Sequence, residues 1–165
     1  MVLFLGRKTP DKGYDLLLHA AEAIWAREPT DTQNLIFRNL GGGRFADVTE
    51  TSGVLYGRAV SRGLAVLDAD GSGTPDLLFA NADGATPALL RNQPHQANGW
   101  LQVRPEGTAS NRDGIGARVV LDRADGLRQV QEVRAGGSYQ SAGTRTLFFG
   151  LGRSSPEVLT VQWPS

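Results

Sequence analysis

The sequence predicts an all-β protein, mainly antiparallel, with one N-terminal helix. Its 165 residues include 21 glycines and 8 prolines, scattered rather than clustered, which is typical of many turns between short strands. From residue 34 onward, short apolar runs are separated by glycine, asparagine and aspartate. Several of these runs place apolar residues at every second position, as a half-buried strand does. We expect about eight to ten strands.

The N-terminal helix is predicted over Asp15–Glu28. Its apolar residues recur at spacings of three and four, and Pro29 ends the pattern. These residues are Tyr14, Leu17, Leu18, Ala21, Ile24 and Trp25. The apolar run Val2–Leu5 is too short for a signal peptide or a membrane span. The chain therefore carries no recognisable signal peptide, and we expect no membrane insertion.

The predicted strands follow one another from residue 34. NLIFRN and RFADVT flank Gly41-Gly42-Gly43, which predicts a hairpin because glycine adopts positive φ without steric cost. GLAVLD and DLLFAN flank the nonapeptide DADGSGTPD, residues 68–76. The remaining strand candidates are PALLRN and, after the polar loop QPHQANG, WLQVR, ARVVLD, RQVQEVR, RTLFFG and VLTVQW. The loop at 93–99 marks a possible domain boundary.

Charge and cysteine content exclude several classes of function. Seventeen basic residues balance seventeen acidic residues, so no net field attracts nucleic acid or an anionic bilayer. We expect no nucleic-acid partner. Because the chain has no cysteine, disulfides, thiolate metal sites and a cysteine nucleophile are excluded.

The nonapeptide at 68–76 offers oxygen ligands at the spacing of a calcium loop. Calcium takes six to eight hard oxygen ligands, and side chains on alternate residues of a tight loop converge on one point. The candidate ligands are Asp68, Asp70, Ser72, the Thr74 carbonyl and Asp76. Gly73 would make the sharp turn. An EF-hand is excluded because Phe79 stands where its bidentate glutamate belongs and the flanks are predicted strands.

A polar surface turn is the alternative to a metal site, because aspartate and glycine are common in turns. Three aspartates lie within the nonapeptide without a lysine or arginine among them, so an empty loop would suffer like-charge repulsion. We favour a cation, and Ca²⁺ over Mg²⁺, since a flexible cage of protein oxygens suits the larger ion. Ser72 is a neutral ligand, which predicts a weak site with a Kd of about 10⁻⁴ to 10⁻³ M.

Other candidate chemistry is weaker. SNRDGIGARV has the glycines of a phosphate loop but lacks its lysine and following helix, so we expect a loop held by side-chain bonds of Asn111 and Asp113. His19 and His95 have no sequence neighbour that would orient a catalytic base. We predict no catalytic residues. An exposed tryptophan could still serve as a platform for a sugar.

The loop and its surroundings resemble FG-GAP (VCBS) repeats, whose calcium hairpin has the form D-x-D-x-[DN]-G-x-x-D. NLIFRNLGGGRFADVTETSGV and SRGLAVLDADGSGTPDLLFANADGATPALLRNQ are similar to two such repeats, although Ser72 and Gly42 depart from the pattern. GTASNRDGIGARVVL, QEVRAGGSYQSAG, LFFGLG and VLTVQWPS, in this order, resemble an ASPIC/UnbV domain of the cartilage acidic protein-like family. The expected regions are an N-terminal helical segment at 1–32, FG-GAP-like repeats at 33–96 and an ASPIC/UnbV-like β-domain at 97–165.

The resemblance implies propeller-like hairpins followed by a sandwich-like or barrel-like domain. It implies a non-enzymatic module for adhesion or interaction, with Ca²⁺ stabilising a hairpin loop, an extracellular or periplasmic location, and a protein or glycan partner. Open strand edges would allow a homo-oligomer. We expect the chain to be a fragment or truncated member of the family. The alternatives are an accessory glycan-binding domain of a secreted hydrolase, or a truncated product without an independent function.

Overall fold

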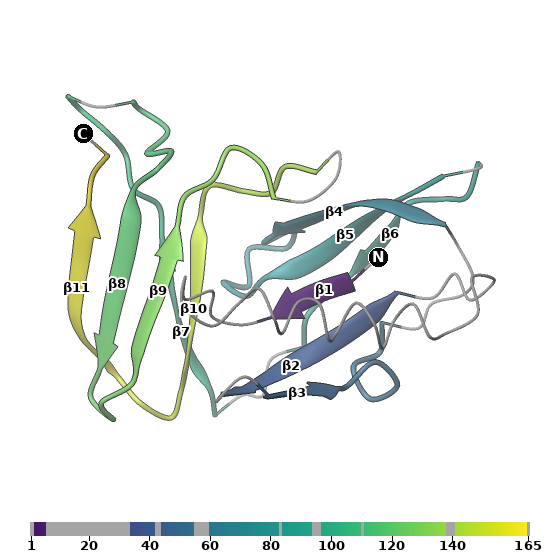
Figure 1. Cartoon of the computed structure of the whole chain (residues 1–165), viewed down its shortest axis with the longest axis horizontal. Coiled ribbons are helices and arrows are strands. Elements are labelled where there is room, and N and C mark those ends of the chain that lie inside the picture. Colours follow the sequence, from purple (N-terminus) through teal and green to yellow (C-terminus); the bar gives the residue numbers. More distant parts are fainter. Residues whose placement is uncertain are drawn as a thin grey trace. The chain divides into compact units, whose positions relative to one another are not determined.

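The computed structural model confirms an all-β protein that is mainly antiparallel (Figure 1). It describes residues 2–5, 34–41, 44–54, 60–82, 84–93, 97–109, 111–137 and 141–164. Eleven strands lie in these ranges, and none of the described residues is helical. They are β1 (Val2–Leu5), β2 (Leu35–Gly41), β3 (Arg44–Asp47), β4 (Ser61–Leu67), β5 (Asp76–Asn81), β6 (Ala88–Leu90), β7 (Gly99–Val103), β8 (Arg118–Arg123), β9 (Arg128–Glu132), β10 (Leu147–Gly152) and β11 (Pro156–Gln162).

The predicted helix Asp15–Glu28 lies outside the described residues. The run Val2–Leu5, for which the sequence predicted no structure, forms β1 and pairs with β2 in parallel. Within the part of the chain that the structure describes, no helix is long and apolar enough to cross a membrane.

The chain divides into two compact units. The first comprises Met1–Arg62 and Asn81–Thr86, and the second comprises Gly63–Ala80 and Pro87–Ser165. The division into regions 33–96 and 97–165, which the resemblance implies, stays a prediction.

The first unit contains the sheet β1-β2-β3. β2 pairs with β3 antiparallel, which confirms the hairpin expected from the sequence. Leu35 and Ile36 of β2 are buried, as is Val54 after β3. The hydroxyl of the buried Thr49 accepts a hydrogen bond from the Ile36 amide at 3.0 Å, so the polar side chain has a partner inside the unit.

The second unit contains a sheet of order β4-β5-β6, in which β5 and β6 are antiparallel. The nonapeptide connects β4 to β5, two neighbouring strands of this sheet, as the sequence predicted. In β5, Phe79 is buried on one face, whereas Leu78 and Ala80 are exposed on the other; Asp76, the first residue of the strand, is buried as well. One end of the nonapeptide is therefore anchored in the interior of the unit.

The second unit also contains the sheets β11-β8-β9 and β10-β7, which share one hydrophobic core. Both sheets pair antiparallel throughout. The core residues are Ala117, Val119, Leu121, Val133, Leu147, Phe149 and Leu151, with Leu101, Val103 and Val161 packed against them. Two glutamines of β9 extend the contact, since Gln129 and Gln131 donate side-chain hydrogen bonds to the carbonyls of Gly150 and Phe148 on β10. β7 contributes Leu101 and Val103 to the packing around this core.

Candidate metal site in the aspartate loop

The aspartate loop, residues 68–76, turns sharply at two glycines. Gly71 has φ +72° and Gly73 has φ +88°, in the left-handed region that glycine adopts most easily. This backbone allows a short connection between β4 and β5 in which Asp68, Asp70 and Asp76 face a common point.

The structure brings the three predicted carboxylates together. Asp68, Asp70 and Asp76 each offer an oxygen atom, and these atoms all lie within 4.8 Å of one another. Two oxygens on opposite sides of a calcium ion are roughly 4.6 to 5.2 Å apart, given Ca–O distances of about 2.3 to 2.6 Å. The spacing therefore fits three ligands of a single ion.

Asp76 is the most rigidly held of the three carboxylates. It is fully buried, and its two oxygens accept hydrogen bonds from the backbone amides of Ala69 at 2.9 Å and Asn92 at 2.8 Å. A buried carboxylate needs such partners because its desolvation is costly. Each carboxylate oxygen has a second lone pair, so these bonds leave acceptor capacity for a cation.

Asp68 and Asp70 share one backbone donor. The amide of Ser72 donates to Oδ1 of both carboxylates at 3.0 Å, and the amide of Gly73 donates to Asp68 Oδ2 at 2.9 Å. Amides from the loop's own turn therefore point at its negative charge. This arrangement stabilises the clustered carboxylates by the same principle as an anion-binding backbone nest.

Ser72 and Thr74, the two neutral ligands predicted from the sequence, contact each other. Their hydroxyl oxygens are 3.0 Å apart, and the Thr74 amide donates to Ser72 Oγ at 3.4 Å. Thr74 is buried, whereas Ser72 is exposed. The Ser72 hydroxyl is therefore hydrogen-bonded to Thr74 within the loop.

Sequence reasoning missed the arginine that pairs with Asp70. Arg91 directly follows β6, and its Nε lies 3.0 Å from Asp70 Oδ2, which its Nη2 also contacts. This hydrogen bond is the largest cause that lowers the pKa of Asp70 to about 2, followed by the hydrogen bonds from Ser72. The pKa of Arg91 is raised by the same pair. The nonapeptide itself has no basic residue, so only the folded sheet reveals this partner.

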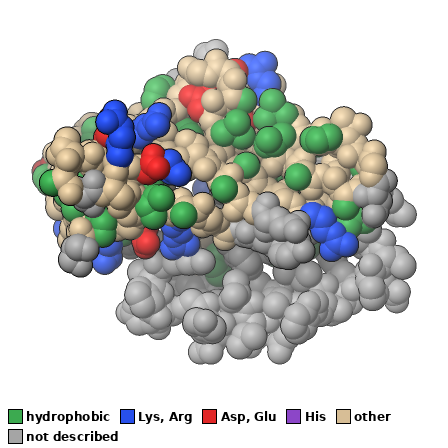
Figure 2. Space-filling view, turned by 90° about the horizontal axis from the view of Figure 1, so that it is seen from above, with side chains coloured by type: hydrophobic (Ala, Val, Ile, Leu, Met, Phe, Trp, Pro, Cys, Tyr) green, Lys and Arg blue, Asp and Glu red, His purple; other side chains and the backbone are tan. Residues whose placement is uncertain are grey.

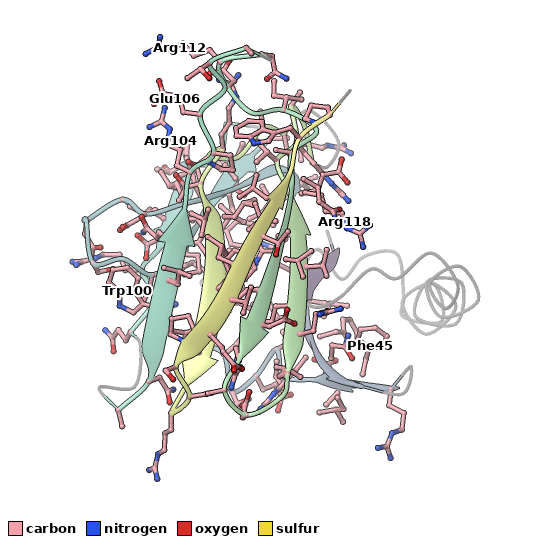
Figure 3. The ribbon with its side chains drawn as sticks, turned by 90° about the vertical axis from the view of Figure 1, so that its left-hand side faces the viewer. Phe45, Trp100, Arg104, Glu106, Arg112 and Arg118 are labelled. Atoms are coloured by element: carbon pink, nitrogen blue, oxygen red, sulfur yellow. The ribbon has the colours of Figure 1, made fainter. Side chains whose placement is uncertain are left out.

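β7 contributes two further contacts that the sequence did not indicate. Gln102 Nε2 donates to Asp68 Oδ2 at 2.8 Å. A Cβ added to Gly73 would overlap the ring of Trp100, so this ring covers the glycine directly. Figure 3 shows Trp100 projecting from β7. The alternation of β7 directs Trp100 and Gln102 away from Leu101 and Val103, and so toward the aspartate loop.

Of the other predicted features, the Asn111 loop is confirmed in part. Asn111 Oδ1 accepts a hydrogen bond from the Ile115 amide at 2.7 Å, and its Nδ2 donates to the Ile115 carbonyl at 2.9 Å. Asp113, expected to bond the backbone, forms an ion pair with Arg145. His19 and His95 lie outside the described residues. The fold thus gives SNRDGIGARV a structural explanation.

Comparison with known proteins agrees with part of the resemblance. Residues 107–165 match the family described as ASPIC and UnbV. This segment contains β8 to β11 and the Asn111 loop.

The chain is also similar to cartilage acidic protein 1. It is 30% identical to the Xenopus tropicalis protein over 104 residues and 30% identical to the Mus musculus protein over 101 residues. These matches cover 62% and 60% of the chain but 16% of each relative, so the chain spans about a sixth of their length. Each of these matches is longer than the segment 107–165, which ends at the last residue of the chain. Both matches therefore also include residues before 107.

Proposed function

We propose that the chain is a non-enzymatic interaction module in which Ca²⁺ stabilises the aspartate loop. The observation that carries this proposal is the convergence of the Asp68, Asp70 and Asp76 carboxylates within 4.8 Å of one another. Ser72 and the Thr74 carbonyl are the proposed neutral ligands. The ion fixes the loop between β4 and β5 and takes part in no reaction.

The donor set supports calcium over other metals. All proposed ligands are hard oxygens, which suit Ca²⁺ and Mg²⁺, and the chain has no cysteine for softer metals. A loop with two left-handed glycines and side chains from several positions favours the larger ion, because Mg²⁺ demands near-ideal octahedral geometry. We propose a Kd of about 10⁻⁴ to 10⁻³ M, in the range of extracellular modules.

The finer fold and the location are part of the same proposal. The loop between neighbouring strands supports an FG-GAP-type hairpin, and the core shared by β11-β8-β9 and β10-β7 supports a sandwich-like domain. A weak calcium site would be filled in an extracellular or periplasmic setting. A protein or glycan partner at a cell surface would then make the module adhesive.

The surface supports a partner that is not a nucleic acid. Figure 2 shows basic and acidic side chains close together on the visible face, without one large basic region. Phosphate backbones are bound by clustered lysine and arginine. Several arginines are also engaged in ion pairs, such as Arg112 with Glu106 and Arg128 with Asp122.

Thermal unfolding tests the proposal. Calcium at ten times its Kd should stabilise the protein by about 1.4 kcal/mol and raise its unfolding midpoint by several degrees. Asp70→Ala should lose this response. Asp122→Asn serves as the control, since it removes an acidic group from a comparable surface ion pair away from the loop.

An unchanged midpoint in millimolar calcium would reject the proposal. The same holds for an Asp70→Ala variant whose calcium response equals that of the parent. A calcium response that Asp70→Ala loses and Asp122→Asn keeps is the expected result.

Glycan binding is the second candidate function, and exposed aromatic residues favour it. Trp100 and Trp163 are 47% and 45% exposed, and sugars stack on such rings. In this role the chain would be an accessory domain of a secreted hydrolase. Binding on a glycan array that Trp100→Ala abolishes would support this function, whereas calcium stabilisation without glycan binding would favour the first.

A further inference from the structure

The aspartate loop already holds a positively charged group. Both Nε and Nη2 of Arg91 contact Asp70 Oδ2, the former at 3.0 Å. The other oxygen of Asp70 accepts the Ser72 amide at 3.0 Å. Asp70 therefore has its charge neutralised by a residue from outside the loop, whereas the partners given above for Asp68 and Asp76 are uncharged amide donors.

A divalent cation at Asp70 and the Arg91 guanidinium would repel each other. An ion bound by the three carboxylates would lie about 2.3 to 2.6 Å from an oxygen of Asp70. The guanidinium is within hydrogen-bond distance of the same carboxyl group, so two positive centres would be neighbours. Their repulsion is twice that of two single charges, because the ion is divalent.

Arg91 is free to leave. Its side chain is 65% exposed, against 24% for Asp70, so the guanidinium can move into water without breaking a packed interior. Exposed ion pairs of this kind contribute little net stability, and the guanidinium is well solvated outside the pair. Among the described residues, the side-chain hydrogen bonds given for Arg91 go to Asp70, and water can replace them when a divalent cation binds that carboxylate.

We propose that Arg91 is an internal competitor of the divalent cation and sets the affinity of the aspartate loop. This inference rests on the proposed calcium site. The loop has two states: in one, Asp70 pairs with Arg91; in the other, Asp70 binds the ion and Arg91 extends into solvent. The guanidinium replaces part of the ion's charge, which keeps the loop folded at low calcium and weakens calcium binding.

The opposite role would give an effect of opposite sign. If Arg91 held Asp70 in position for the ion, its removal would weaken binding, because Asp70 would lose its orientation. Competition predicts tighter binding when Arg91 is removed. The direction of one affinity change therefore separates the two roles.

Calorimetric titration with calcium chloride provides the measurement, on the full chain and two variants. Arg91→Gln should bind calcium about five- to tenfold more tightly than the parent. Arg128→Gln is a matched control, because the Arg128–Asp122 pair has nearly the same exposure, 62% and 29%, and the variant loses the same charge. The control should bind with the affinity of the parent.

A second readout follows the arginine itself. The Arg91 Nε–H signal in NMR spectra should shift toward that of a solvated guanidinium as calcium is added, whereas the Arg128 signal should remain in place. Binding by Arg91→Gln at calcium concentrations where the parent binds too weakly to measure would also support the inference.

Two results would overturn the inference. Equal or weaker calcium binding by Arg91→Gln would reject competition while leaving the calcium site intact. No binding by the parent, Arg91→Gln and Arg128→Gln alike would reject the proposed function, and the inference with it.

Discussion

At the scale of single residues, the pKa of Asp70 reports the electrostatic environment of the aspartate loop. Its carboxylate accepts a charged partner, Arg91, and a backbone donor, Ser72, and these hold the pKa of Asp70 at about 2. Asp122 shows the same effect in a second pair, since the hydrogen bond from Arg128 lowers its pKa. Both ion pairs are exposed, so each shifts the pKa of its aspartate but contributes little to the stability of the fold.

We predict that Arg91→Gln raises the pKa of Asp70 toward its ordinary value in calcium-free protein. The folded pKa lies below the unfolded value of about 3.9, so the pair stabilises the fold above that pH. This contribution is lost as the pH falls through about 2. An NMR titration of the Asp70 side-chain carboxyl carbon measures the change. A pKa that stays near 2 in the variant would show that Arg91 is not its main cause.

Gly73 and Gly71 provide a matched test of how tightly β7 covers the loop. Both have positive φ, but a Cβ at Gly73 would overlap the Trp100 ring, whereas one at Gly71 would meet nothing within 4 Å. Gly71→Ala should cost about 1 to 2 kcal/mol from backbone strain alone. Gly73→Ala should cost about 1 to 3 kcal/mol more, because the ring must move.

Urea unfolding of both variants measures the difference. Trp100→Ala combined with Gly73→Ala should recover most of the additional loss, since the clash is removed. Equal losses in the two single variants would mean that Trp100 does not lie against Gly73.

At the scale of elements, the side chains of β10 alternate between buried and less buried positions. Leu147, Phe149 and Leu151 are buried, whereas Phe148 is only partly buried and Gly150 is exposed. The strand could be predicted from the apolar run in RTLFFG, but its inward face could not, since Leu147, Phe148 and Phe149 are all apolar. The partners of β10, namely β7 and the glutamines of β9, could not, because pairing depends on contacts between distant residues.

We predict that Phe149→Ala destabilises the second unit by about 3 to 5 kcal/mol, because it opens a cavity in a fully buried core. Phe148→Ala, its neighbour on the same strand, should cost clearly less. Chemical denaturation followed by circular dichroism measures both. Similar losses in the two variants would contradict the assignment of the inward face.

In the aspartate loop, too, features within the loop could be predicted from the sequence, whereas contacts with distant residues could not. Three aspartates on alternating and near-alternating positions indicated a candidate metal site, and the strands on either side of the loop are confirmed. Arg91, Trp100 and Gln102 were missed because each follows the loop by many residues and reaches it only through the fold of the sheet. A local motif predicts its own turn, but not the charges and rings that tertiary structure places against it.

At the scale of the whole molecule, the loop belongs to the same compact unit as the segment that matches the ASPIC and UnbV family. Residues 68–76 lie in Gly63–Ala80, and residues 107–165 lie in Pro87–Ser165. Within this unit Gln102 bonds Asp68 while its neighbours on β7 pack on the core. Calcium bound in the loop should therefore stabilise the unit through β7, rather than stabilise an isolated hairpin.

Terbium luminescence tests the central claim most directly, because Tb³⁺ replaces Ca²⁺ in oxygen sites and is excited by a nearby tryptophan. Trp100 lies against Gly73, so a bound ion would be next to an energy donor. We predict emission that calcium abolishes by competition, that Asp68→Asn and Trp100→Phe remove, and that Trp163→Phe retains. Absence of tryptophan-excited emission in the parent, or emission that Asp68→Asn leaves unchanged, would contradict a metal site in the aspartate loop.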